Sequence, residues 1–166
     1  PAGQATKPAN TAAQAAAGYV DYDDATGLFA LNPEQAAVFA DEGSPASMAG
    51  AFEVVASLWL DEPKVAEAFR HGRGLGWHEH SQCLFRGTER FFRPGYNANL
   101  VSAWLPALDG VVAKLQRGAV VADVGCGHGT STLVMARAFP QSQFVGFDYH
   151  APSIESATKA ARDAGL

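Results

Sequence analysis

The sequence contains few cysteines, more acidic than basic residues and no long apolar segment. Its 166 residues include two cysteines, which cannot form the disulfide framework of a small secreted protein. Lys and Arg total 12 against 17 Asp and Glu, and the resulting net charge of −5 argues against a broad nucleic-acid-binding surface. No apolar run approaches the roughly 18 residues of a membrane span, and the Ala- and Gln-rich start does not resemble a signal peptide. These features predict a cytoplasmic protein that binds neither membranes nor nucleic acid.

The most informative segment is a glycine-rich turn that follows an apolar run. Residues 119–122 are apolar and predict a buried strand, which ends at Asp123. The turn then contains three glycines, at Gly125, Gly127 and Gly129. A helical pattern follows over residues 130–139. A strand, a glycine turn and a helix in this order bring the backbone close to a nucleotide-like ligand.

A second unit of the same kind follows directly. Residues 144–147 predict another strand, which ends at Asp148, and residues 151–164 predict a helix that Gly165 caps. Two strands joined by a helix imply parallel pairing with a right-handed crossover, so Asp123 and Asp148 should lie side by side. Parallel sheets are normally covered on both faces. We therefore expect this chain to be a fragment, or the remaining strands to be disordered or supplied elsewhere.

The details of the turn favour S-adenosylmethionine over a dinucleotide. The dinucleotide fingerprint is Gly-x-Gly-x-x-Gly, whereas here Gly129 comes one residue early and Thr130 takes the expected place. The carboxylate of Asp123 is unfavourable beside a pyrophosphate but favourable beside a sulfonium or ammonium group. The carboxylate of Asp148 can accept hydrogen bonds from both ribose hydroxyls.

The residues before this α/β unit predict a hairpin. Residues 1–17 are low in complexity, and we expect the first ten to be poorly ordered, with a short helix starting near Thr11. Residues 19–22 and 28–31 flank a five-residue turn that contains glycine, which is typical of a β-hairpin.

Residues 32–117 predict a mostly helical region, punctuated by prolines. Asn32, Pro33 and Gln35 together form a helix-start signal, and Ser44-Pro45 repeats it. The second helix should present an apolar face made by Met48, Phe52, Val55 and Trp59. We expect Pro63 to begin a third short helix, a short helix at 88–92 to be broken by Pro94-Gly95, and a last helical region at 97–116 to be interrupted at Pro106.

The residues of the two α/β motifs resemble the class I S-adenosylmethionine-dependent methyltransferases. The first motif of that family is an acidic residue followed by Gly-x-Gly-x-Gly, and the second is the acid that closes the next strand. The resemblance implies a Rossmann-like sheet and a cofactor site. It assigns cofactor binding to Asp123, Gly125, Cys126, Gly127, Gly129, Asp148 and Tyr149. In the family, the residue at the position of Tyr149 often packs on the adenine.

The segments 76–80 and 90–96 resemble a narrower group of bacterial two-domain methyltransferases with a winged-helix-like N-terminal domain. That resemblance makes residues 1–31 the remnant of this domain, with the hairpin as its wing. Residues 32–117 become a helical linker region and residues 118–166 the first part of the cofactor-binding domain. It also implies a small-molecule methyl acceptor and a homodimer in the full-length protein. A complete class I sheet has about seven strands, so we expect little activity from these 166 residues alone.

Several other side chains could carry chemistry. His78 and His80 suggest a metal site, but no third ligand is evident, and His78 is alternatively a general base. The favoured interpretation is a polar loop that packs near the open side of the cofactor. Cys126 is either a small residue of the cofactor pocket or a thiol of low pKa near a helix start. His128 and His150 are expected as solvated turn residues. Trp77 and Tyr96 are candidates for ligand contact, whereas no catalytic residue can be assigned.

Two other functions fit parts of the sequence. A winged-helix transcriptional regulator, or a cofactor-sensing module without catalysis, would explain the hairpin and the glycine turn. The acidic composition and the lack of a recognition helix weigh against a regulator. A nicotinamide-dependent oxidoreductase is disfavoured by the glycine spacing and by Asp123.

Overall fold

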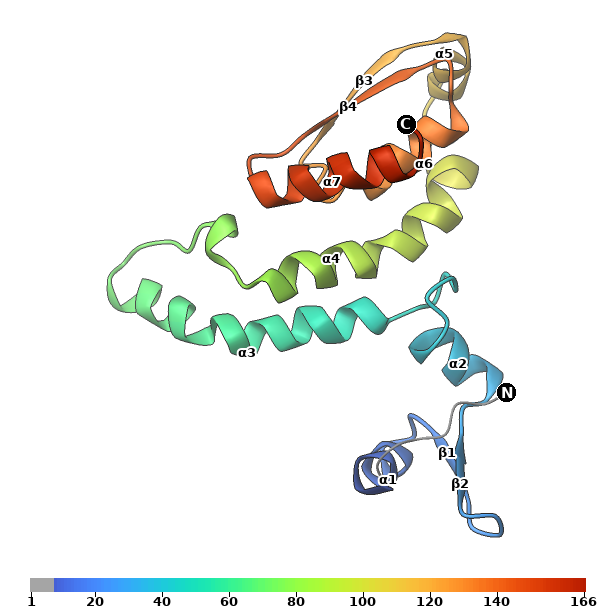
Figure 1. The fold of residues 1–166 in the computed structure, drawn as a ribbon, viewed down its shortest axis with the longest axis vertical. Helices are drawn as coiled ribbons and strands as arrows, with labels where there is room; N and C mark the ends of the chain where they lie inside the picture. The colour runs from blue at the N-terminus through green and yellow to red at the C-terminus, as the bar shows by residue number, and fades with distance from the viewer. Residues whose placement is uncertain (1–7) are drawn as a thin grey trace. The chain divides into compact units, whose positions relative to one another are not determined.

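A computed structural model describes residues 8–166 of the chain (Figure 1). The chain forms two compact units, residues 1–47 and residues 48–166, and we describe each by itself. Residues 1–7, which belong to the segment expected to be poorly ordered, lie outside the described part. The division of the sequence at residues 31 and 117 remains a prediction.

The first unit contains two short helices and the predicted hairpin. Helix α1 spans Pro8–Ala16, so residues 8–10 are helical rather than poorly ordered as expected. Strand β1 (Asp21–Asp23) pairs antiparallel with β2 (Leu28–Ala30), which confirms the hairpin. Helix α2 spans Pro33–Phe39. Whether this unit is a winged helix remains a prediction.

The start of α2 follows the capping signal in the sequence. The Asn32 side chain accepts a hydrogen bond from the Gln35 N–H at 2.9 Å, and the Gln35 side chain accepts one from the Asn32 N–H at 3.0 Å. Both side chains also donate to the Asp21 carboxylate, at 3.2 and 3.1 Å. The capping box therefore fixes the helix start and also ties it to the hairpin.

Two long helices begin the second unit and lie side by side (Figure 1). Helix α3 spans Ala49–Arg70, and α4 spans Gln82–Gly95 after a short 3₁₀ turn, η1, at Trp77–Glu79. The helices can approach closely because Gly50 and Gly87 have no side chain. A Cβ at Gly50 would overlap the backbone of Phe91, and one at Gly87 would lie 2.7 Å from the Val54 nitrogen. These contacts hold the first turns of α3 against the middle of α4.

Two prolines that were expected to delimit helices lie inside them. Pro63 lies within α3 and begins no third helix, and Pro94 lies within α4 instead of breaking it. The start signal at Ser44-Pro45 is also not used, since α3 begins at Ala49. Proline removes one helical hydrogen bond, yet both helices continue past their prolines. The expected short helix at 88–92 is therefore the middle of a longer one.

The helical region continues without a break into a π-helix. This element, η2, spans Tyr96–Trp104, and the Leu105 N–H bonds to the Leu100 carbonyl at 2.9 Å. The predicted interruption near Pro106 is confirmed, because the next helix, α5, spans Val111–Arg117. Gly118 ends α5 with φ of 100°, which only glycine adopts readily.

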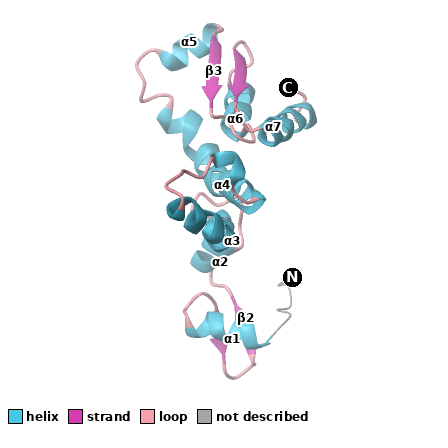
Figure 2. Cartoon of the chain, turned by 90° about the vertical axis from the view of Figure 1, so that its left-hand side faces the viewer, coloured by secondary structure: helices cyan, strands magenta, loops and turns pink. Residues whose placement is uncertain are grey.

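The C-terminal part confirms the predicted β-α-β-α order (Figure 2). Strand β3 (Val120–Val124) pairs parallel with β4 (Gln143–Phe147), and Val121 lies opposite Phe144. Helix α6 (Thr130–Ala138) connects the strands, and α7 (Ala151–Asp163) follows β4. The fold is thus α/β, with a Rossmann-like β-α-β-α unit after a helical region.

The apolar core of the second unit covers one face of this sheet. Leu105, Leu115 and Phe139 are buried and pack with Val121 and Phe144. On the opposite face the side chains of Val120 and Val124 are 75% and 82% exposed. The strand expected to be buried is therefore covered on one face among the residues that the structure describes.

The predicted apolar face of α3 is also exposed. Met48, Phe52, Val55 and Trp59 all have large solvent-accessible fractions, with Trp59 at 73%. Within residues 8–166, no helix combines the length and the apolar character needed to cross a membrane.

Candidate functional site

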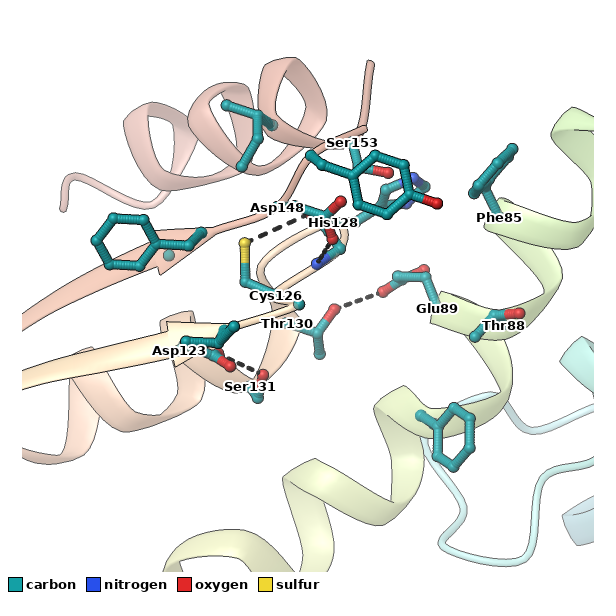
Figure 3. Close-up of a pocket in the computed structure, with 18 of the residues that line it drawn as sticks. Phe85, Thr88, Glu89, Asp123, Cys126, His128, Thr130, Ser131, Asp148 and Ser153 are labelled. Carbon is teal, nitrogen blue, oxygen red and sulfur yellow. Dashed lines mark hydrogen bonds between the residues drawn. The ribbon is translucent and has the colours of Figure 1, made fainter. Parts of the chain in front are cut away.

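The second unit contains a cavity of about 1060 Å³ at the carboxyl ends of β3 and β4 (Figure 3). One wall consists of the glycine turn, the acids that end the strands, and the starts of α6 and α7. The other wall comes from η1, α4 and the first residue of η2. All seven residues predicted to bind the cofactor belong to this region, and six of them line the cavity: Asp123, Gly125, Cys126, Gly127, Asp148 and Tyr149.

The glycine turn takes a conformation that requires glycine. Gly125, Gly127 and Gly129 have φ of 78°, 54° and 81°, in the left-handed region that side chains disfavour. Gly129, the seventh predicted residue, is buried, and a Cβ there would lie 3.0 Å from the Ala157 Cβ. The third glycine therefore allows α6 and α7 to approach each other beneath the turn.

The N–H groups of the turn already have partners within the protein. Those of Gly125 and Cys126 donate to the Phe147 carbonyl at 2.7 and 3.1 Å. The N–H of Gly127 donates to the Asp148 carboxylate at 3.0 Å. A pyrophosphate would thus find these three donors occupied, which disfavours a dinucleotide in this turn.

Asp123 holds the start of the helix that follows the turn. Its Oδ2 accepts hydrogen bonds from the hydroxyls of Ser131 and Thr132, at 2.8 and 2.6 Å. Both hydroxyls belong to the first turn of α6, so the carboxylate fixes the end of β3 to the beginning of that helix. Asp123 also lines the cavity, where its negative charge favours a cationic group.

Asp148 is oriented by two backbone groups. Its Oδ2 accepts from the Gly127 N–H at 3.0 Å and its Oδ1 from the His150 N–H at 2.8 Å. A carboxylate has about four acceptor positions, so each oxygen keeps one for a ligand. The side chain is therefore preorganised at the cavity wall, with its rotamer held at both oxygens.

Tyr149 lies at the rim of the cavity. Its side chain is 69% exposed, and its ring meets that of His78 edge to face at 6.1 Å. The tyrosine follows β4, whereas the histidine belongs to η1. The two rings thus come from opposite walls, and Tyr149 offers a free aromatic face of the kind that stacks on a base.

Cys126 is buried, and its chemistry differs from that of a reactive thiol. Burial raises the pKa of this thiol, and the carboxylates of Asp123 and Asp148 raise it further. The alternative of a low-pKa nucleophile is therefore wrong. The thiol instead fills a tight space, because a Cβ at Gly146 would lie 2.8 Å from its sulfur.

Glu89 is a site residue that the sequence did not point out. It projects from α4 into the cavity, and its Oε1 accepts from the Thr130 hydroxyl at 2.8 Å (Figure 3). Arg93 donates to both of its oxygens, at 2.9 and 2.7 Å. Burial opposes ionisation, but the hydrogen bonds from Arg93 and Thr130 outweigh it and lower the pKa of Glu89. The one available signal was the Glu-to-Arg spacing of four residues, which is common on solvated helices.

Asp61 is a second residue that sequence reasoning missed, and it supports the wall formed by η1. It is 3% exposed and accepts from the Ser81 N–H at 2.9 and 3.0 Å, from Lys64 at 3.0 Å and from His80 at 2.9 Å. Burial raises its pKa, but these bonds outweigh that effect and lower the pKa to about 2. The carboxylate therefore ties α3 to the segment that carries Trp77.

The histidines occupy different environments from those expected. His150 is buried, stacks on Phe85 with ring centroids 4.1 Å apart, and shares a hydrogen bond with Ser153, so it is not a solvated turn residue. His78 lies in a 3₁₀ turn and His80 contacts Asp61, so they do not share the face of a strand. Across the described residues, no three His, Cys, Asp or Glu side chains gather in a way that could hold a metal ion.

Three further candidates border the cavity. Trp77, Tyr96 and His128 all line it, and Trp77 packs edge to face on Phe85 at 5.3 Å. Tyr96 packs against Trp104 at 6.0 Å. Aromatic side chains thus form much of the wall opposite the glycine turn.

The C-terminal residues match known methyltransferases in sequence. Residues 115–166 match the family model described as a methyltransferase domain. A tRNA (guanine-N(7)-)-methyltransferase of Yersinia pseudotuberculosis is 43% identical over 47 residues, which cover 28% of this chain and 20% of that protein. The match spans about a fifth of the length of this relative.

The fold matches solved methyltransferases over almost the whole chain. An O-methyltransferase family protein of Burkholderia thailandensis superposes with a TM-score of 0.63 and 19% identity, covering 94% of this chain and 46% of that one. The mitomycin 7-O-methyltransferase superposes with a TM-score of 0.60 and 19% identity, covering 96% and 48%. The chain spans about half the length of these proteins, and the likeness extends to the helices before the α/β unit.

Proposed function

We propose that this protein is an S-adenosylmethionine-dependent methyltransferase that acts on a small-molecule acceptor. The observation that carries the proposal is the meeting of Asp123, Asp148 and the glycine turn in one cavity. The match of residues 115–166 to a methyltransferase domain supports the same reading. The alternatives of a transcriptional regulator and of a non-catalytic sensor lack such support.

The cavity suits this cofactor in shape and in charge. Asp148 accepts hydrogen bonds from the ribose hydroxyls with the free acceptor positions of its two oxygens. Tyr149 packs on the adenine. At Gly125 and Gly127 a Cβ would meet no other atom within 4 Å, so the turn leaves open space along the cofactor. Cys126 is a small residue of the cavity wall, and Gly129 lets α6 and α7 pack closely beneath the turn. Asp123 faces the cationic part of the cofactor.

The bound cofactor supplies an activated methyl group with its own leaving group. The protein's residues therefore act mainly by alignment and by excluding water. The aromatic wall of Trp77, Phe92 and Tyr96 covers the side of the cavity opposite the turn. No residue of this chain is assigned as a catalytic base.

The acceptor is proposed to be a small molecule that carries a hydroxyl group. The solved relatives that match almost the whole chain are O-methyltransferases. The tRNA methyltransferase matches only 28% of it, and the net charge of −5 disfavours binding to RNA.

A homodimer is part of the proposal. The exposed apolar side chains of α3, including Phe52, Trp59 and Phe69 at 55%, 73% and 83%, provide a surface that a second copy can cover. Light scattering coupled to size-exclusion chromatography tests this, and a monomer at micromolar concentration contradicts it.

Titration calorimetry tests the proposed cofactor. We expect S-adenosylmethionine and S-adenosylhomocysteine to bind more tightly than NAD, because the N–H groups of Gly125, Cys126 and Gly127 already donate to acceptors of the protein. Tighter binding of NAD would refute the assignment. Transfer of a radiolabelled methyl group to a panel of phenols and alcohols then tests the acceptor class.

A further inference from the structure

The carboxylate of Glu89 faces the glycine turn from the opposite wall of the cavity. It comes from α4, outside the segment that matches the methyltransferase domain. Its side chain is 20% exposed and bonds to Thr130, the first residue of α6 (Figure 3). An ionised acceptor group therefore lies where the helical region meets the start of the α/β helix.

The position of Asp148 sets the direction in which a cofactor extends. If the ribose binds Asp148 and the base packs on Tyr149, the base lies on the side toward α7. The amino-acid end then extends along the glycine turn toward Thr130 and Glu89. This end is a zwitterion, with an ammonium group that needs an acceptor when it leaves water.

Glu89 and Asp123 are the two acids near this end, and they differ in their partners. The Oδ2 of Asp123 accepts hydrogen bonds from two hydroxyl groups of α6. Glu89 accepts from the Thr130 hydroxyl and, at both oxygens, from Arg93, which lines an adjoining hollow of about 350 Å³. Glu89, His128 and Thr130 line both hollows. A carboxylate and a guanidinium side by side are complementary to an ammonium and a carboxylate.

We propose, on the basis of the proposed function, that Glu89 accepts a hydrogen bond from the α-ammonium group of the cofactor and makes tight binding depend on the amino-acid end. Arg93 positions the Glu89 carboxylate for this contact. The helix α4 then acts as a wall that recognises the cofactor, in addition to its role in packing against α3. Residues beyond the two sequence motifs thus decide which adenosine derivatives bind.

Calorimetry with two ligands tests this proposal. S-adenosylhomocysteine carries the amino-acid end, whereas 5′-methylthioadenosine keeps the adenosine and the thioether but lacks that end. We expect Glu89→Gln to weaken binding of S-adenosylhomocysteine roughly tenfold or more, as for a lost charge-assisted hydrogen bond. Binding of 5′-methylthioadenosine should change less than about twofold, within the usual effect of a surface substitution.

Glu53→Gln is the matched control. Glu53 is 25% exposed and is also paired with an arginine of α4, at 2.6 Å from Arg90, but it does not line the cavity. We expect this variant to leave both affinities unchanged. A selective loss in Glu89→Gln alone supports the proposal.

Other results would overturn it. An equal loss for both ligands assigns Glu89 a purely structural role, and unchanged affinities remove it from the site. A selective loss in Asp123→Asn, without one in Glu89→Gln, assigns the ammonium group to Asp123. If the unmodified protein binds neither ligand, the proposed function itself fails. If it binds both equally well, the cofactor assignment stands, but the amino-acid end is not recognised.

Discussion

Replacing Asp148 with alanine is the most direct perturbation of the cofactor site. The two carboxylate oxygens each have one position left for a ribose hydroxyl, since Gly127 and His150 occupy the others at 3.0 and 2.8 Å. Loss of two charge-assisted hydrogen bonds should cost about 2–4 kcal/mol. This corresponds to a loss in affinity for S-adenosylhomocysteine of roughly 30- to 1000-fold.

Asp148→Asn tests two roles of Asp148 together: its contact with the ligand and the hydrogen bonds by which it orders the turn. Its amide oxygen can accept in place of one carboxylate oxygen, whereas its NH2 group would face the N–H of either Gly127 or His150. Two donors that face each other leave both without a partner. We therefore expect the asparagine variant to bind more weakly than the unmodified protein but more tightly than the alanine variant.

Calorimetry with S-adenosylhomocysteine gives the dissociation constants, and thermal unfolding shows whether each variant is folded. Asp163→Ala serves as the control, because this aspartate on α7 has a side chain 62% exposed and does not line the cavity. An unchanged affinity in a folded Asp148→Ala variant would remove Asp148 from the site and refute the reasoning.

Two further predictions concern the support of the site. Gly146→Ala should destabilise the fold by about 1–3 kcal/mol in chemical denaturation, because its Cβ would lie 2.8 Å from the Cys126 sulfur; Cys126→Ala in the same background should recover part of the loss, and no recovery would contradict the contact. The folded pKa of Asp61, about 2, lies below its ordinary value of 3.8, so its stabilising contribution is present above pH 3.8 and is lost as the pH falls toward 2. Asp61→Asn should flatten the decrease in unfolding free energy over this range, and an unchanged slope would contradict the assignment.

Local sequence signals predicted the structure correctly where it depends on residues that are close together in the sequence. The Asn32 capping box formed because its partners lie three residues apart and need no other element. The glycine turn was recognisable because left-handed φ values restrict those positions to glycine. The parallel pairing that brings the ends of β3 and β4 together followed from chain connectivity.

The prolines were misread because a local signal does not show that the helix around it is part of a longer, packed one. In isolation Pro63 and Pro94 favour a helix start or a break. In the folded chain α3 and α4 meet at Gly50 and Gly87, which are too close to the partner backbone for a side chain. The sequence contains the two glycines, but Gly50 meets Phe91 and Gly87 meets Val54, residues 41 and 33 positions away along the chain.

The sequence by itself therefore determined the α/β unit, its turn and the acids Asp123 and Asp148. Only the tertiary structure brought Glu89 to Thr130, across 41 residues, and Asp61 to Ser81, across 20. The reason is physical: the state and partners of a carboxylate depend on its burial and on the donors around it, and both arise from packing between distant segments. A single sequence reveals the local motif, whereas the opposite wall of the cavity exists only once α4 packs against the α/β unit.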